Sequence, residues 1–358
     1  MTLQNLDEIA ATPDAPALVV EVWRGPLLES RHRGHIVAVT GDGRIVATLG
    51  QPSIWAYFRS AAKPFQALPL VVSGAADAFH FNEQELALAC ASHNGEPLHT
   101  GTVANMLRKT GLDMGALRCG AHEPFNVEVT RALRSSGRPP TTLHNNCSGK
   151  HAGFLALALH LGASLETYDE LSHPVQQAVL QTIARFADMS PAEIVAGVDG
   201  CAAPVFAVPL QAMALMYARL VNPPPDFDEL TRQACQRITQ AMMNYPEAIG
   251  GRAERLDTKI MQSAPGRLVS KIGAEGVYTA GLLPCDKWPQ GLGLAVKIED
   301  GEDRRARPVT VIEAMRQLEM LDESALAALA PYSRLAIRNH RGDTVGEVRP
   351  VFKLTNDY

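Results

Sequence analysis

Apolar and polar positions divide the chain into strands, a long helical middle and strands again. Runs rich in β-branched residues at 18–23, 36–39 and 45–49 predict strands near the N-terminus. Gly41, Asp42 and Gly43 separate the last two runs and indicate a hairpin turn. After Pro265 the pattern predicts strands at 267–271, 276–280 and 291–298, a helix over about 309–321, a short helix near 323–330, and a final hairpin over 334–348.

From residue 53 to about 263, apolar positions mostly recur at helical spacing. Asn82 and Glu85 form a capping signal before an apolar run, and Gly111 and Gly162 are expected helix stops. The predicted helices include 100–110, 150–161, 173–188, 208–221 and 226–244.

The order of these elements favours an α+β fold, in which the N- and C-terminal strands share one antiparallel sheet and the helical block is inserted between them. We expect an N-terminal tail over 1–16 and a single domain over 17–358, with its helical subregion over about 53–263. No period of 20–50 residues recurs, so a repeat architecture is not expected.

Composition excludes several classes of partner. The chain of 358 residues is 46% hydrophobic and 20% charged, with a net charge of −5 and no run of lysine and arginine, so nucleic acid is not expected to bind. No apolar run is long enough to span a membrane, and residues 1–16 do not resemble a secretory signal. Six cysteines without an export signal predict reduced thiols and a cytoplasmic location.

Ser60 and Lys63 form an S-x-x-K motif. If Ser60 opens a helix, the two side chains lie on one face and can touch. A neutral lysine amine can take the proton of a serine hydroxyl and make it a nucleophile. The alternative is a helix cap followed by a solvated lysine.

Two further fragments follow in the order found in penicillin-recognising serine acyltransferases. Ser92-His93-Asn94 is an S-x-N motif in a predicted inter-helix loop, and Lys271-Ile272-Gly273 is a K-x-G motif after a predicted strand. Ser92 and Lys271 would form a second hydroxyl–amine pair that relays protons or holds a carboxylate. Ile272 replaces the usual hydroxyl residue, which argues against β-lactam recognition.

A separate cluster of residues contains two cysteines. Cys147 and Lys150 lie at the start of a predicted helix, and Asp199 and Cys201 follow about fifty residues later. Two cysteines with an Asp or His could hold zinc, but C-x-x-K is not a zinc-finger spacing. From spacing alone, two buried structural thiols remain the favoured interpretation. The other four cysteines, among them Cys285, have no motif around them and are expected to pack in the core.

Taken together, these motifs resemble the rhizobial-type, class 3 L-asparaginases of the asparaginase II family, from Val20 to about Pro350. The stretch from Asn145 to His151, within the motif that begins at His144, is highly specific. The other motifs that carry the resemblance lie at 59–66, 90–96, 119–122, 198–201 and 271–276.

The resemblance implies hydrolysis of L-asparagine to L-aspartate and ammonia, by a homodimer with a fold similar to serine β-lactamases and glutaminases. It also implies two Ser–Lys pairs, an acidic residue and a zinc ion, which reverses the interpretation of the cysteines. The matching positions are Ser60 with Lys63, Ser92 with Lys271, Asp199 beside the metal, and Cys147, Lys150 and Cys201 as zinc ligands.

In the expected mechanism, Ser60 attacks the side-chain amide with Lys63 as base, and water hydrolyses the aspartyl ester. Arg59, His93 and Glu96 are candidates for binding the substrate's charged groups, or else they cap loops. Because a neutral lysine is required, activity should rise toward alkaline pH. The rival hypotheses are another serine acyltransferase of the β-lactamase or glutaminase class, and a non-catalytic amino-acid-binding protein with structural zinc.

Overall fold

The computed structural model describes residues 15–252 and 255–356. The chain forms two compact units. The first comprises the chain up to Phe58, Ala207–Asn222 and the chain from Gly273 onward, and the second comprises Arg59–Phe206 and Pro223–Ile272. The predicted tail lies outside the described residues up to position 14, and the single-domain expectation for 17–358 stays a prediction.

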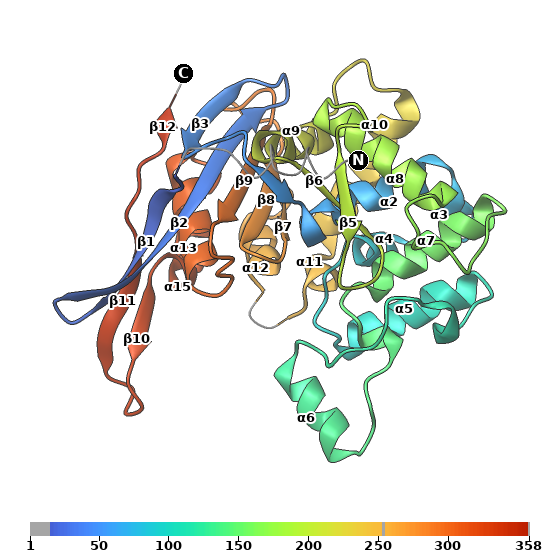
Figure 1. Cartoon of the computed structure of the whole chain (residues 1–358), viewed down its shortest axis with the longest axis horizontal. Coiled ribbons are helices and arrows are strands. Elements are labelled where there is room, and N and C mark those ends of the chain that lie inside the picture. The colour runs from blue at the N-terminus through green and yellow to red at the C-terminus, as the bar shows by residue number, and fades with distance from the viewer. Residues whose placement is uncertain (1–14, 253–254, 357–358) are drawn as a thin grey trace. The chain divides into compact units, whose positions relative to one another are not determined.

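The first unit is built on an antiparallel sheet in which strands from both ends of the chain alternate (Figure 1). Its neighbours run in the order β10-β11-β1-β2-β9-β8, and β3 pairs with β2 and with β12. The strands are β1 (Ala17–Arg24), β2 (Leu27–Thr40), β3 (Ile45–Leu49), β8 (Val277–Leu282), β9 (Leu292–Ile298), β10 (Leu335–Arg338), β11 (Thr344–Pro350) and β12 (Thr355–Asn356).

The register confirms that the two ends of the chain share one sheet. Val22 of β1 lies opposite Val348 of β11, and Val37 of β2 lies opposite Ala295 of β9. The predicted α+β class is therefore confirmed, as are the hairpin at 41–43 and the C-terminal hairpin.

Helices of the first unit pack against this sheet. They are α9 (Leu210–Val221) and α13 (Ala306–Gln317), whereas α15 (Ala330–Ser333) contacts α13 and α14 (Glu323–Ala328). A Cβ atom at Gly293 of β9 would lie 1.8 Å from the carbonyl oxygen of Ala214 in α9, so glycine is needed for this close contact.

The second unit is mainly helical. Its elements are η1 (Arg59–Ala62), α2 (Lys63–Val72), α3 (Ala75–Ala78), α4 (Glu83–Ala89), α5 (Pro97–Lys109), η2 (Met114–Ala116), α6 (Val127–Ser135), η3 (Thr142–His144), α7 (Ser148–His160), α8 (Pro174–Ala187), β5 (Val195–Val198), α10 (Glu229–Asn244), α11 (Pro246–Ile249), α12 (Leu256–Ser263) and β7 (Leu268–Ile272). Helix α2 is buried along almost its whole length and packs against α7, α8 and α10, so it forms the centre of this unit. The predicted cap at Asn82 and Glu85 is confirmed as a capping box on α4.

Some sequence predictions were wrong in detail. The block expected to be helical also contains the short strands β4 (Trp55–Tyr57), β5 and β6 (Pro204–Pro209). Short apolar runs do not distinguish a buried strand from a helix, which explains this error. Cys285 is exposed rather than packed in the core, since it lies in the connection between β8 and β9.

None of the helices in the described ranges has the length and apolar character needed to cross a lipid bilayer.

Candidate active site

Ser60 and Lys63 lie where the chain enters the central helix of the second unit. Ser60 belongs to the 3-10 turn η1, and Lys63 is the first residue of α2, so the serine precedes the α-helix instead of opening it. Arg59 has a φ of 52°, a left-handed conformation that is uncommon for a residue with a side chain. Strained backbone of this kind concentrates at functional sites.

The Lys63 amine is buried and donates hydrogen bonds to main-chain carbonyls. Its Nζ lies 2.6 Å from the carbonyl oxygen of Ala91 and 3.4 Å from that of Asn146. No hydrogen bond from this amine to the Ser60 hydroxyl is present in the described part of the chain. Lys63 therefore joins the segment before Ser92 to the segment before Cys147.

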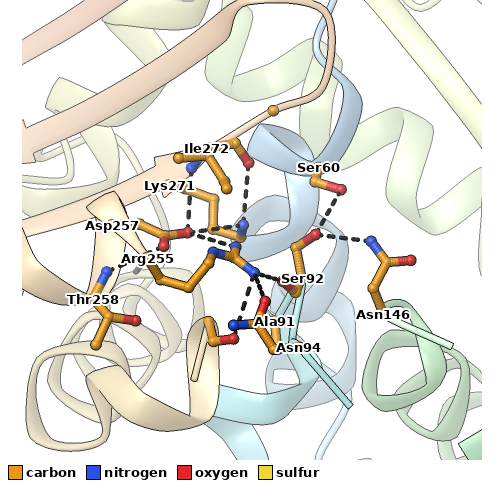
Figure 2. Close-up of polar contacts among 12 residues, drawn as sticks. Ser60, Ala91, Ser92, Asn94, Asn146, Arg255, Asp257, Thr258, Lys271 and Ile272 are labelled. Carbon is orange, nitrogen blue, oxygen red and sulfur yellow. Dashed lines mark hydrogen bonds and ion pairs between the residues drawn. The ribbon is translucent and has the colours of Figure 1, made fainter. Parts of the chain in front are cut away.

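Ser92 provides the hydrogen-bond partner of Ser60. It follows the end of α4, and its Oγ donates to the Ser60 Oγ at 3.3 Å (Figure 2). The side-chain Nδ2 of Asn146 donates to the same Ser92 oxygen at 3.0 Å. The two predicted serines thus form one hydroxyl pair, fixed from the other side by an asparagine.

Lys271 lies on β7 and is completely buried. Its Nζ donates to the Ile272 carbonyl at 3.1 Å and lies 3.4 Å from Oδ2 of Asp257. Burial lowers the pKa of the Lys271 amine to about 7, although the Asp257 carboxylate acts in the opposite direction. A lysine with this pKa can accept and return a proton near neutral pH.

The predicted metal ligands come together in the same unit. Cys147 directly precedes α7, Lys150 lies in the first turn of that helix, and Cys201 lies in the turn between β5 and β6. The Lys150 Nζ is 3.2 Å from the Cys201 sulfur, and the Cys147 thiol forms a hydrogen bond with the same sulfur. All three side chains are buried.

This arrangement favours a thiolate at Cys201. The hydrogen bond from Cys147 and the charge of Lys150 lower the pKa of the Cys201 thiol to about 5, against the effect of burial. The same hydrogen bond, together with burial, raises the pKa of the Cys147 thiol to about 12. Burial opposes the charge of Lys150, yet the neighbouring sulfur atoms raise the pKa of its amine overall.

Asp199 connects this cluster to Ser60 through the chain neighbour of that serine. One guanidinium nitrogen of Arg59 lies 3.1 Å from the Asp199 Oδ1. Burial tends to raise the pKa of Asp199, but the charge of Lys150 outweighs it and the pKa is lowered. Ala202, just after Cys201, has a φ of 70°, so strained backbone is found on this side of the site as well.

Two of the three candidate substrate-binding residues are deeply buried. His93 is fully buried, stacks on His99 with ring centroids 4.7 Å apart, and lies 3.0 Å from the Ser148 hydroxyl. Glu96 precedes α5 and accepts hydrogen bonds from Asn126 and the main chain of Arg252. Arg59 is the candidate with a partly exposed charged group, at 28% side-chain exposure.

Three residues that the sequence analysis did not single out complete the hydrogen-bond network: Asn146, Arg255 and Asp257. Asn146 belongs to the conspicuous Asn145-Asn146-Cys147 turn, so that turn was a signal for it. Arg255 and Asp257 belong to no recognisable motif. An aspartate in the first turn of a helix is common, because it interacts favourably with the helix dipole, so its position gave no signal of a role in the site.

The donors present fit a thiophilic divalent ion. Two sulfur atoms and one amine nitrogen meet at one place, and one sulfur is held as a thiolate. In the described ranges, no three His, Cys, Asp or Glu side chains lie close enough together to hold a metal ion. A metal at this place would therefore need Lys150 in its uncharged form as the third ligand.

Comparisons with known proteins identify a family for this chain. The family model described as L-asparaginase II matches residues 20–350. A comparison with curated protein sequences finds no match. Among solved structures, a probable glutaminase from Bacillus subtilis, complexed with 6-diazo-5-oxo-L-norleucine, is 12% identical, with 90% of each chain covered and a TM-score of 0.38. A β-lactamase from Burkholderia ambifaria is 15% identical, with 84% of this chain and 92% of that chain covered and a TM-score of 0.36.

Proposed function

Because this chain belongs to the L-asparaginase II family, a family of amidohydrolases, we propose that it hydrolyses L-asparagine to L-aspartate and ammonia. The observation that best supports the proposal is the pair of serine hydroxyls 3.3 Å apart, in the same unit as a buried lysine whose pKa is lowered to about 7. Such a set can activate an oxygen nucleophile and return its proton to a leaving group.

In the first step, Ser60 Oγ forms a bond to the side-chain carboxamide carbon of the substrate. Its proton passes to Ser92, and Ser92 gives its own proton to the neutral amine of Lys271. The carbon–nitrogen bond then breaks. The leaving nitrogen takes the proton back from Lys271 through Ser92 and departs as ammonia, which leaves an aspartyl ester on Ser60.

Water completes the reaction by the reverse route. Its oxygen attacks the ester carbon and its proton passes to the amine of Lys271. The ester bond to Ser60 breaks, and the serine oxygen recovers a proton from Lys271 through Ser92. L-aspartate leaves and both serines return to their starting state.

The sequence alone assigned the first proton transfer to Lys63. Because the Lys63 amine donates to the carbonyls of Ala91 and Asn146, we assign it a different part. It holds these two segments around Ser92 and contributes a positive charge beside the developing oxyanion.

The charged groups of the substrate need partners of opposite sign. Arg59 has a partly exposed guanidinium that suits the α-carboxylate, and Asp199 suits the α-ammonium group. His93 and Glu96 stay predicted contacts, and the positions of their buried side chains support a role in shaping the loop that follows Ser92.

Zinc remains part of the proposal, with Cys147, Lys150 and Cys201 as its ligands. Bound there, the ion would supply positive charge beside Asp199. Metal analysis of the purified protein is the test, with Cys147→Ala as the variant and Cys235→Ala, a buried thiol outside the cluster, as the control. About one zinc per chain in the protein and in the control, with loss in Cys147→Ala, is the expected result. A metal-free active protein would refute this assignment.

The decisive experiment measures ammonia release from L-asparagine and L-glutamine in parallel. We expect release from L-asparagine and a loss of about 10³-fold or more in Ser60→Ala. Hydrolysis of nitrocefin in place of L-asparagine would instead favour a different serine acyltransferase. Binding of L-asparagine without turnover would favour a non-catalytic binding protein. The homodimer and the cytoplasmic location stay predictions.

A further inference from the structure

A buried group of charges contacts both the Ser92 main chain and the Lys271 amine, and two of its members, Arg255 and Asp257, have no place in the reaction described above. Asp257 is completely buried in the first turn of α12, and Arg255 precedes that helix and is nearly buried. One guanidinium nitrogen of Arg255 lies 3.3 Å from the Asp257 Oδ2, the oxygen that is also 3.4 Å from the Lys271 amine. Figure 2 shows the three side chains meeting at that carboxylate oxygen.

Arg255 also reaches the segment that contains Ser92. Its other terminal nitrogen donates to the Ser92 carbonyl at 2.5 Å and to the Asn94 side-chain oxygen at 2.8 Å (Figure 2). A planar guanidinium can form such a two-sided bridge, whereas a lysine would offer a single point charge. The Ser92 main chain and the Lys271 amine are therefore connected through one arginine and one carboxylate.

Burial of three charges without solvent is unfavourable unless each is well paired. Asp257 meets this condition, because its other oxygen accepts the main-chain N–H of Thr258 at 3.1 Å. Burial tends to raise the pKa of Asp257, but Arg255 and Lys271 lower it to about 2, so the carboxylate stays charged at working pH. A costly charge cluster held next to a reacting group suggests a functional purpose.

We propose that Arg255 and Asp257 are positioning residues that fix the Lys271 amine relative to Ser92 and set the charges that surround it. This inference rests on the proposed function, because it concerns the proton path of the same reaction. Neither residue touches the reacting atoms in this scheme.

The charged and titratable groups that face Lys271 determine whether its pKa should rise or fall when Asp257 is replaced. Asp257 raises the pKa of the Lys271 amine, whereas Lys63 and Arg255 lower it. Cys90 is also close, but burial raises the pKa of its thiol to about 12, so it stays neutral. Removal of the Asp257 charge should therefore lower the pKa of Lys271 further and move the acid limb of the activity profile to lower pH.

The test compares Asp257→Asn with the unchanged enzyme by measuring kcat/KM for L-asparagine across about pH 5 to 9. We expect the midpoint of the acid limb to fall by about one unit or more. The plateau of kcat should fall about 10- to 100-fold because the amine is less well placed. KM should stay within about threefold, since no substrate contact is removed.

Asp169→Asn is the matched control, since Asp169 is a nearly buried carboxylate of the same unit paired with Arg118 at 2.7 Å. It should leave the midpoint unchanged. Arg255→Lys provides a second variant that keeps the charge but cannot bridge to Ser92 and Asp257 together. It should lower kcat with little shift of the midpoint.

An unshifted midpoint in folded Asp257→Asn would overturn the proposal. If that variant does not fold, as judged by circular dichroism, unchanged kcat in Arg255→Lys would overturn it instead. If instead the proposed function were wrong, the unchanged enzyme itself would release no ammonia from L-asparagine, so the two hypotheses fail in different experiments.

Discussion

At the scale of single residues, the two buried lysines of the site differ in what surrounds the amine. Lys63 donates to two main-chain carbonyls, whereas Lys271 donates to one and also lies beside a buried carboxylate. The surroundings of Lys271 lower its pKa to about 7. Two buried lysines of one site can therefore have different roles, and the pH dependence of activity distinguishes them.

We predict that kcat/KM of the unchanged enzyme rises with pH around a midpoint near 7, because only the neutral amine of Lys271 accepts a proton. Lys63→Ala should lower the rate but retain a rising limb. Lys271→Ala should lower the rate and remove that limb. Initial rates of ammonia release at a series of pH values measure both effects, and a flat profile from about pH 6 to 9 in the unchanged enzyme would contradict the prediction.

Much of the site could be predicted from the sequence, because its side chains occur in short motifs. Cys147, Lys150 and Cys201 meet, as the resemblance implied, whereas the sequence paired Ser60 with Lys63 and did not predict its hydrogen bond with Ser92. The partners of the motif residues could not be predicted. Asp257 reaches Lys271 across fourteen positions of sequence, and only the packing of α12 and β7 brings them together.

At the scale of elements, α7 illustrates how packing places a site. It carries Cys147 at its cap and Lys150 in its first turn, and it packs against α4. A Cβ atom at Gly149 would lie 2.3 Å from the carbonyl oxygen of Leu88, so only glycine lets the two helices approach this closely. The glycine thus sets the distance from α7 to the segment that carries Ser92.

Gly149→Ala should therefore reduce the free energy of unfolding by about 1–3 kcal/mol, since backbone atoms cannot move aside cheaply. Gly153→Ala is the control in the same helix, because its Cβ would lie 3.4 Å from the nearest atom, an ordinary contact. Alanine also favours helix, so this control should be neutral or slightly stabilising. Urea unfolding of both variants measures the difference, and equal stabilities would contradict this account of α7.

Helices and strands can be predicted from the sequence only where interactions within a few residues determine them. Helix caps act within one turn, so the capping box at Asn82 and Glu85 could be recognised directly. Strands β5 and β6 are short and lie inside a helical block, so their pairing depends on contacts that periodicity does not encode. The turn between them carries Asp199 and Cys201, which were found from their chemistry and not from the predicted structure.

At the scale of the whole molecule, the second unit retains a buried cation that opposes folding. An unfolded lysine has a pKa of about 10.4, whereas that of Lys271 in the folded chain is about 7. Between these two values the unfolded chain binds more protons, so this group makes the free energy of unfolding rise with pH. Below about pH 7 the penalty is complete and constant, and above about pH 10.4 it is absent.

Lys271→Met should consequently be more stable than the unchanged protein near pH 7, by at most about 5 kcal/mol, and this gain should shrink as the pH rises toward 10. Arg255 still pairs with Asp257 in the variant, so the carboxylate keeps a partner. Urea unfolding at several pH values measures the difference between the two proteins, in which the titration of other groups cancels. Lys353→Met, at an exposed lysine, is the control and should change the free energy of unfolding little. A gain in Lys271→Met that stays constant from about pH 7 to 10 would show that Lys271 titrates in the folded protein as an ordinary lysine does, and would remove the basis for its part in proton transfer.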